Sequence, residues 1–323
     1  MTRHSAVPPP VTAVLDASST WLPARLADAE QQLREEVRGH GEVLAADASS
    51  TLEAGGKRLR PLLVLLCAGP ESQSGPAVRA AAAVELVHMA TLVHDDVLDD
   101  APLRRGRPTV AATSGRLRAT AAGDLLFSRA FALLARAGDA RAIELLAWAS
   151  VSLARGELAQ RQDAYDTSIG EARYFERCRL KTAALFECAV RMGRDEEALG
   201  AFGAEVGLAF QLLDDVLDVA GPPERTVKAR GTDLLDGTVT LPLILAGESD
   251  PGLLAADLRS LDEPAAAALS DRIAATDALD RVRARALEMV AAAKARLAAD
   301  TGLGGEQRRL LELVADGVVQ RYS

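Results

Sequence analysis

The chain has 323 residues, of which 49% are hydrophobic and 26% are charged. This is an ordinary globular composition, and it excludes wholesale disorder and fibrous repeats. The formal net charge of −9 argues against a protein whose main partner is nucleic acid, and an aromatic content of 3% argues against stacking platforms for single-stranded bases. Ala and Leu dominate while β-branched and aromatic residues are sparse, so helix is the favoured secondary structure.

The three cysteines, Cys67, Cys178 and Cys188, are widely spaced and form no CxxC or CxxH pair. We interpret them as small buried residues in a reducing compartment, since no local signature supports a disulfide framework, a zinc site or a thiol nucleophile. The longest dense apolar stretch, 62–68, is far shorter than the roughly 20 residues that span a bilayer. The sequence therefore predicts a cytoplasmic protein with no targeting or transmembrane segment.

Residues 1–20 contain a Pro triplet and predict a flexible lead-in, after which helical periodicity continues to the end of the chain. Gly and Pro residues predict breaks in the helices at 55–56, 69–76, 102–108, 138–139, 167–170, 193–194, 221–237 and 249–252. No strand-like alternation, fixed-length repeat or Pro/Ser-rich linker is present. We therefore predict a single all-α domain over 21–323, built as one large helical bundle.

The segment 84–100, VELVHMATLVHDDVLDD, is an apolar helix that ends in carboxylates. On a helix, Asp95 and Asp99 form an i,i+4 pair, and Asp96 and Asp100 form a second pair beside it. Like charges at this spacing destabilise a helix, and Asp is a poor helix former. A cation at this helix end would account for the pattern.

The segment 206–219, VGLAFQLLDDVLDV, repeats the same D-D-x-x-D spacing with Asp214, Asp215 and Asp218. A single acidic helix end is readily explained as a solvated surface, but two clusters of identical spacing after apolar runs are not. Mg²⁺ is the natural candidate, because it prefers oxygen ligands and binds through one or two carboxylates plus substrate phosphates. The EF-hand ligand pattern is missing from both segments.

Two basic segments are placed to receive phosphate. GGKRLRP at 55–61 puts three cations at a predicted helix start, where free backbone N–H groups also favour anions. RRGRPT at 104–109 follows the first acidic cluster, and Arg grips phosphate oxygens with two hydrogen bonds. Either segment alone is best explained as a solvated loop. The position of the second segment, directly after the predicted metal site, favours a diphosphate that bridges the metal and the guanidinium groups.

Together these segments resemble the trans-isoprenyl diphosphate synthases (polyprenyl synthetases). GGKRLRP, ELVHMATLVHDDVLDD, LRRGRPT, KTAALF, AFQLLDDVLD, TDLLDG and VTLP occur in the family's order. The resemblance implies an all-α isoprenoid synthase type I fold around a deep central cavity, usually in a homodimer. It implies an enzyme that joins isopentenyl diphosphate to an allylic diphosphate with Mg²⁺, at about three ions per active site.

The resemblance also implies roles for individual residues. The metal ions would be held by Asp95, Asp96 and Asp99 and by Asp214 and Asp218, with Asp215 as support. Isopentenyl diphosphate would be bound by Lys57, Arg60, His88 and Arg105. The allylic diphosphate would be bound by Arg104, Lys181 and Lys228, and Thr182 and Gln211 would orient the carbocation and the diphosphate.

The loop after the second cluster departs from the family pattern. Val227 stands where the family commonly has Gly, and Thr238 stands where it commonly has Lys. One cationic diphosphate contact is therefore missing, and Arg230 is a candidate substitute. The departure puts diphosphate affinity in doubt rather than the type of reaction.

Product length depends in this family on side chains just before the first cluster. Ala90 and Thr91 are small, so the cavity is expected to stay open past the farnesyl length. Phe127 and Phe131 are candidates for its floor. We predict a long-chain product, from heptaprenyl to decaprenyl, with geranylgeranyl as the main competitor.

Two other functions are consistent with parts of the pattern. A class I terpene cyclase also ionises diphosphates, but it has no use for a second diphosphate pocket such as GGKRLRP. A catalytically silent subunit that regulates a true synthase is the alternative of another class. The intact acidic clusters argue against the silent subunit.

Overall fold

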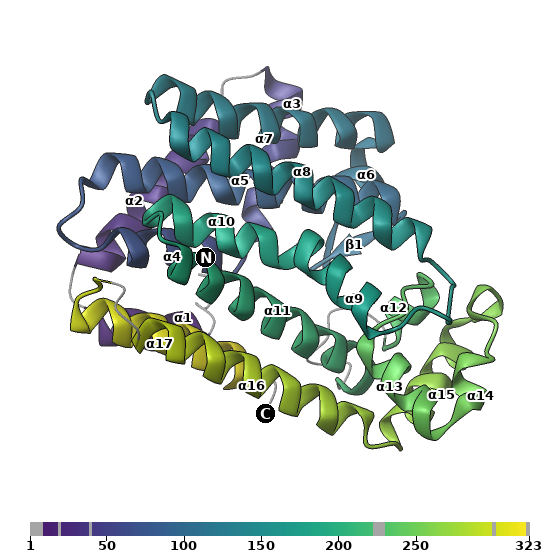
Figure 1. The fold of residues 1–323 in the computed structure, drawn as a ribbon. Coiled ribbons are helices and arrows are strands. Elements are labelled where there is room, and N and C mark those ends of the chain that lie inside the picture. The colour runs from purple at the N-terminus through teal and green to yellow at the C-terminus, as the bar shows by residue number, and fades with distance from the viewer. Residues whose placement is uncertain (1–8, 19–20, 39–40, 222–229, 299–301, 321–323) are drawn as a thin grey trace.

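The computed structural model describes residues 9–18, 21–38, 41–221, 230–298 and 302–320, which form a bundle of helices (Figure 1). The helices of the first half are α1 (Pro9–Ala17), α2 (Trp21–Glu36), α3 (Glu42–Glu53), α4 (Leu59–Ala68), α5 (Ser74–Leu98), α6 (Val110–Ser114), α7 (Arg116–Arg136) and α8 (Ala140–Gln162). Those of the second half are α9 (Glu171–Cys178), the π-helix η1 (Arg179–Ala183), α10 (Ala184–Gly193), α11 (Glu197–Ala220), α12 (Thr232–Leu235), α13 (Leu241–Ser249), α14 (Pro251–Leu254), the 3₁₀-helix η2 (Leu258–Ser260), α15 (Glu263–Ala274), α16 (Ala278–Ala298) and α17 (Gly305–Gln320). The predicted all-α fold is confirmed.

The only strands in the described residues are β1 (Leu103–Arg104) and β2 (Arg107–Pro108), which pair antiparallel. Leu103 is paired with Pro108, and Arg104 is paired with Arg107. The turn between them places Arg105 and Gly106 at φ 53° and 73°, in the left-handed region. This short hairpin directly follows α5 and carries the basic segment back beside the acidic one.

Helix α5 lies at the centre of the bundle, because its sequence is apolar on nearly every side. It packs against α2, α4, α7 and α10. Among the described residues it alone is long and apolar enough to cross a membrane, but 72% of its apolar window is buried inside the bundle, which is the pattern of a core helix. Helix α11, the second acidic segment, packs against α10 and α16.

Helices α16 and α17 run along one side of the bundle, and α12 to α15 gather at one end (Figure 1). The flexible lead-in expected over 1–20 was wrong for Pro9–Ala17, which is helical and packs against α17. The side chain of Val14 on this helix is fully buried. Burial of an apolar side chain, not helix propensity alone, accounts for the order of this segment.

Several helix breaks were not predicted, and two of them occur at single glycines. Gly41 and Gly115 have φ values of 80° and 83°, which glycine adopts without the cost that a Cβ imposes. Each glycine stands directly before a helix, α3 or α7. The breaks at 255–257, 261–262, 275–277 and 302–304 were not predicted either, whereas the other breaks from 55–56 to 249–252 were predicted at Gly and Pro positions.

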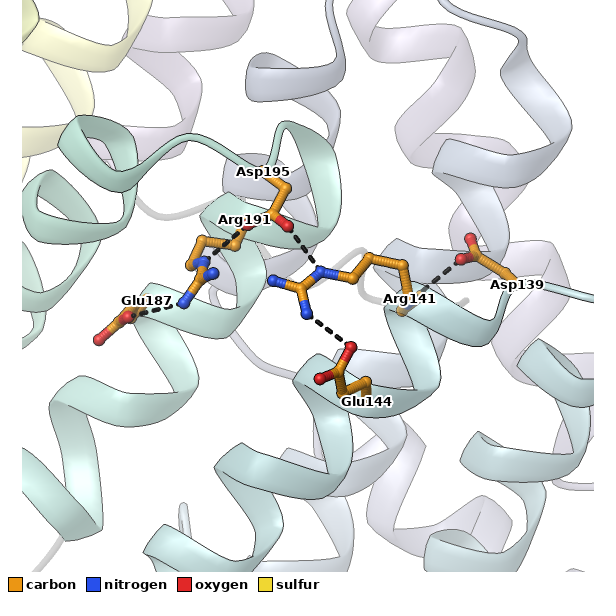
Figure 2. A network of polar contacts seen from close by, with 7 residues as sticks. Asp139, Arg141, Glu144, Glu187, Arg191 and Asp195 are labelled. Atoms are coloured by element: carbon orange, nitrogen blue, oxygen red, sulfur yellow. Dashed lines mark hydrogen bonds and ion pairs between the residues drawn. The ribbon is translucent and has the colours of Figure 1, made fainter.

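An ion-pair network joins the start of α8 to the end of α10 (Figure 2). Arg141 Nε lies 2.6 Å from Asp195 Oδ2, and Arg191 Nε lies 2.8 Å from Asp195 Oδ1. Arg141 Nη1 also pairs with Glu144 at 2.6 Å. Exposed pairs of this kind contribute little each, but the network connects α8 to the end of α10.

Candidate active site

The ends of α5 and α11 meet at one cavity of about 280 Å³, enclosed by α8, α9, η1 and the segment that precedes α13. Acidic side chains from both segments line it together with basic ones. The polar lining residues are Arg60, His88, Thr91, Asp95, Asp99, Arg104, Gln160, Tyr174, Arg177, Cys178, Lys181, Thr182, Gln211, Asp214, Asp215, Asp233, Asp236, Thr238 and Thr240. The two D-D-x-x-D segments, more than 100 residues apart in sequence, therefore face the same space.

In the first cluster, Asp95 and Asp99 line the cavity, as one helical turn between them requires. Asp99 also pairs with Arg161 from α8. Asp96 differs from the expectation: it is buried, accepts a hydrogen bond from Arg104 Nε at 2.7 Å and lines a neighbouring cavity instead. It is one residue, or about 100°, away from Asp95 around the helix, and its hydrogen bond with Arg104 accompanies its position at the neighbouring cavity.

In the second cluster, Asp214 and Asp215 line the cavity. Asp215 is buried, and its two oxygens accept hydrogen bonds from Tyr174 Oη (2.6 Å) and Gln211 Nε2 (2.7 Å). Asp218 is not among the described lining residues. It accepts a hydrogen bond from the backbone N–H of Asp233 at 3.2 Å and so holds the following segment against α11.

Burial sets the ionisation of these carboxyl groups. It raises the pKa of Asp95 to about 6, although Lys181 opposes the shift. It also raises the pKa of Asp215 to about 8, with Asp233 and Asp214 adding to the shift and the hydrogen bonds from Tyr174 and Gln211 opposing it. A cation in the cavity would offset the cost of ionising such groups.

The oxygen donors fit a hard divalent cation. Within the described residues, no three His, Cys, Asp or Glu side chains stand close enough to hold a metal ion by themselves. An ion bound to one or two of these carboxylates would complete its shell with water and with oxygens of a bound phosphate, which is the usual arrangement of Mg²⁺.

The basic segment before α4 contributes unequally to the cavity. Arg60 lines it, and its guanidinium lies 4.5 Å from the centre of the Phe186 ring. Its Nε is buried without a hydrogen-bond partner among the described residues, and burial lowers its pKa to about 10. Lys57 is not among the described lining residues, and its Nζ lies 5.0 Å from the centre of the Phe210 ring.

Glu85 on α5 is the counter-charge of the basic side chains. It is 3% exposed and accepts a hydrogen bond from Arg58 Nη1 at 2.8 Å. Arg58 also pairs with Glu30, so this arginine is fixed as part of the scaffold. The negative charge of Glu85 raises the pKa values of Arg60 and Arg105, against the effect of burial.

Arg105 and His88 differ in position: His88 lines the main cavity, whereas Arg105 lines the neighbouring cavity together with Asp96. A Cβ at Gly56 would lie 3.1 Å from Arg105 Nη1, so glycine at 56 leaves room for the guanidinium. His88 lines the cavity, and burial together with Arg60 and Arg105 holds its pKa well below its usual value. The ring is therefore neutral at neutral pH and can donate one hydrogen bond and accept another.

Lys181 stands on the π-helix η1, a local widening of the helix that is frequent at functional sites. It pairs with Glu157 of α8 and lines the cavity. The approach of α8 to η1 depends on Gly156, because a Cβ there would lie 2.5 Å from the backbone nitrogen of Lys181. Thr182 Oγ1, next along η1, donates a hydrogen bond to Gln211 Oε1 at 2.7 Å.

The family model for polyprenyl synthetase matches residues 42–269. This chain belongs to the polyprenyl synthetase family. It is 39% identical over 280 residues to the heptaprenyl diphosphate synthase component 2 of Geobacillus stearothermophilus. The aligned region covers 83% of this chain and 87% of that protein. The sequence-based assignment to the family, as a prenyltransferase, is confirmed.

Solved structures of polyprenyl synthetases share the fold. One is a polyprenyl synthase of Caulobacter crescentus complexed with calcium and isoprenyl diphosphate, with a TM-score of 0.89, 34% identity and coverage of 97% of this chain and 98% of that one. Another is a decaprenyl diphosphate synthase of Rhodobacter capsulatus, with a TM-score of 0.85, 32% identity and coverage of 97% and 99%.

The loop in which the chain departs from the family pattern is partly described. Lys228 and Val227 lie outside the described residues. Thr238 lines the cavity, where the family commonly has Lys. Arg230 does not replace that lysine: its Nε donates to Val219 O and its Nη2 to Asp271, both at 2.7 Å, which holds it outside the cavity lining.

Several lining residues were not predicted. Asp233 and Asp236 bring two further carboxyl groups to the cavity, and Tyr174 and Arg177 of α9 close one wall. Tyr174 stands seven residues, or about two helical turns, before Lys181, so helical periodicity alone would have placed both on one face. Asp233, on α12, and Asp236 belong to the TDLLDG segment of the family resemblance, but the sequence assigned them no role.

A second cavity of about 390 Å³ adjoins the first between α5, α7 and α8. Thr91, Asp95, Leu153 and Lys181 line both cavities, and Phe127 of α7 lines the second. The remaining lining residues are His94, Leu98, Ser150, Ala154, Glu157 and Leu158. Ala90 is fully buried and Phe131 packs against the core, and neither is among the described residues that line this cavity.

Proposed function

We propose that this polyprenyl synthetase condenses isopentenyl diphosphate with an allylic diphosphate, head to tail, to give an all-trans polyprenyl diphosphate. The observation that carries the proposal is the shared cavity: carboxyl groups from α5 and α11 line it together with Arg60, Arg104 and Lys181. Such a site has acidic groups for metal ions and cationic groups for phosphate oxygens in one enclosed space.

Mg²⁺ would be held by Asp95 and Asp99 on one side and Asp214 on the other, together with diphosphate oxygens. When bound, it neutralises the charge that develops on the departing diphosphate. Asp218 as a ligand, and about three ions per site, stay expectations from the family resemblance. The orientation of Asp96 toward Arg104 supports a role in fixing that arginine instead.

Different side chains bind the diphosphates of the two substrates. Arg60, Arg105 and neutral His88 bind the diphosphate of isopentenyl diphosphate, and Lys181 and Arg104 bind that of the allylic substrate. The allylic C–O bond breaks, and the leaving diphosphate keeps the electron pair. The isopentenyl double bond then attacks the allylic carbon, a C–C bond forms, and the released diphosphate takes the proton that the adduct loses.

Apolar side chains keep water from the cation. Leu153, Leu185 and Phe210 line the cavity between the charged groups. A carbocation exposed to water would be captured as an alcohol, so this lining favours attack by the second substrate.

The second cavity supports a long-chain product, from heptaprenyl to decaprenyl. Thr91 stands where the two cavities adjoin, and its small side chain leaves the passage open. Phe127, stacked against His94 with ring centres 5.8 Å apart, closes the α7 side. Geranylgeranyl diphosphate is the alternative product.

A homodimer is supported by an apolar stripe on α8. Trp148, Val151 and Leu158 share one face of this helix and are 42%, 60% and 63% exposed. Burying such a face against a second copy would stabilise the pair. Sedimentation of the wild type and of Val151→Glu tests this: a dimer that dissociates in the variant supports the interface, and a monomeric wild type contradicts it.

The reaction is tested by incubating the protein with Mg²⁺, labelled isopentenyl diphosphate and, separately, dimethylallyl, geranyl, farnesyl and geranylgeranyl diphosphates. Chromatography of the dephosphorylated products gives their length. Products beyond geranylgeranyl support the long-chain proposal, and a stop at geranylgeranyl overturns only the product length. The Geobacillus relative is named component 2, so a silent chain that becomes active only with a partner would favour the subunit alternative.

A further inference from the structure

A chain of three hydrogen bonds runs from the protein interior to the wall of the main cavity. Tyr174 Oη donates to Asp215 Oδ2 at 2.6 Å, and Gln211 Nε2 donates to Asp215 Oδ1 at 2.7 Å. Thr182 Oγ1 in turn donates to Gln211 Oε1 at 2.7 Å. The chain links α9, α11 and η1, and all of its members line the cavity.

The interior end of this chain is rigid. Tyr174 is 1% exposed, and its ring packs edge-on against Phe175 with the ring centres 5.3 Å apart. The guanidinium of Arg177 lies 5.7 Å from the centre of the tyrosine ring. Because the ring cannot turn away, its hydroxyl holds one oxygen of Asp215, a residue that is itself 2% exposed.

Hydrogen bonds on both sides of Gln211 fix the direction of its amide. The amide N–H₂ faces Asp215 Oδ1, and the carbonyl oxygen faces Thr182 Oγ1. The Thr182 proton is then used in its bond to Gln211, and the lone pairs of its hydroxyl oxygen remain for the cavity. Fixed lone pairs are suited to stabilise positive charge that develops on a reacting carbon.

We propose that Tyr174 is a positioning residue, which acts through Asp215 and Gln211 to orient the Thr182 hydroxyl oxygen toward the allylic cation. The inference rests on the proposed prenyl transfer. It assigns Asp215 to hydrogen bonding within the protein, since both of its oxygens already accept hydrogen bonds. The proposal also gives a function to Tyr174, whose contacts described above are with Asp215, Phe175 and Arg177.

Tyr174→Phe removes the hydroxyl and keeps the ring. We expect kcat to fall about tenfold, which corresponds to about 1.4 kcal/mol of transition-state stabilisation. KM for isopentenyl diphosphate and for farnesyl diphosphate is expected to stay within about twofold of the wild type, because the diphosphate-binding side chains are untouched. Tyr165→Phe is the matched control, because Tyr165 is not among the described lining residues and its ring lies 4.7 Å from the Arg259 guanidinium; it is expected to leave both constants unchanged.

A double-mutant cycle with Gln211→Ala separates positioning from a general structural effect. If Tyr174 acts through Gln211, the hydroxyl deletion costs little once the amide is gone, so the two effects on kcat are not additive. A wild-type kcat in Tyr174→Phe, a raised KM at unchanged kcat, or additive effects would each overturn the inference. If thermal unfolding shows that Tyr174→Phe does not fold, a cycle that combines Asp215→Asn with Gln211→Ala replaces it. Additive effects of these two substitutions on kcat would likewise overturn the inference. An inactive wild type would refute the proposed function itself, and an active wild type with an unaffected variant would refute only this inference.

Discussion

Glu85 is the buried counter-charge of the basic side of the cavity, and its replacement by glutamine tests that arrangement. Glu85→Gln keeps the shape and one acceptor oxygen, but it removes the negative charge 2.8 Å from Arg58 Nη1 and leaves Glu30 as the remaining ion-pair partner of that arginine. Removing one member of a buried ion pair costs about 3–5 kcal/mol, and the retained acceptor favours the lower end. We therefore expect the free energy of unfolding to fall by about 3 kcal/mol.

The expected change is readily measured by thermal unfolding. An unfolding entropy of about 2.1 cal/mol/K per residue gives roughly 0.7 kcal/mol/K for this chain, so the Tm of Glu85→Gln is expected to fall by about 4–5 °C. Inorganic diphosphate is expected to raise the Tm of the variant more than that of the wild type, because it supplies the missing negative charge.

The matched control is Glu144→Gln, which breaks the exposed pair with Arg141 shown in Figure 2. It is expected to leave the Tm unchanged, since exposed pairs contribute little. A Tm of Glu85→Gln within 1 °C of the control would refute the assignment of Glu85 as the buried counter-charge.

Three further predictions follow from other parts of the site. Gly156→Ala would force η1 away from α8, since its Cβ would lie 2.5 Å from the Lys181 nitrogen; kcat/KM is expected to fall more than tenfold, and an unchanged value would contradict this contact. His88 has a folded pKa below its unfolded value, so it contributes stability above about pH 6.5 that is lost as the pH falls, at up to about 1.4 kcal/mol per pH unit. His88→Gln is expected to flatten the decline of Tm between pH 7 and pH 5, and parallel profiles would contradict the shift. Thr91→Phe is expected to shorten the products by closing the passage, Phe127→Ala to lengthen them and Phe131→Ala to leave them unchanged; chromatographic sizing decides each case.

The helical architecture and the two acidic helix ends could be predicted because helix period and residue type act locally. Asp95 and Asp99 are one turn apart, so their shared face follows from the sequence alone. The direction taken by Asp96 could not be predicted, because it depends on Arg104, which the β1–β2 hairpin carries back beside α5. The hydrogen bonds of Arg230 to Val219 O and Asp271 likewise could not be predicted, because they depend on the packing of α15 near α11.

Burial decided the remaining differences between expectation and structure. Tyr174 carries no charge and belongs to no acidic or basic run; helical periodicity places it on the face of Lys181 but does not predict its contact with Asp215. Phe127 and Phe131 are one helical turn apart on α7, yet only Phe127 is among the described residues lining the second cavity, a distinction set by where α8 lies. Long-range packing of this kind has no local signature.

The central claim is that carboxylates of the shared cavity support a Mg²⁺-dependent prenyl transfer. The most direct measurement is incorporation of labelled isopentenyl diphosphate into farnesyl diphosphate with and without Mg²⁺, by the wild type, by Asp95→Asn and by the exposed control Asp280→Asn. We expect the wild type and the control to incorporate isopentenyl diphosphate, and we expect omission of Mg²⁺ to abolish this. In Asp95→Asn we expect the rate to fall at least a hundredfold, which corresponds to a loss of about 2.7 kcal/mol or more of transition-state stabilisation. Wild-type rates in Asp95→Asn, or incorporation that does not depend on Mg²⁺, would contradict the account.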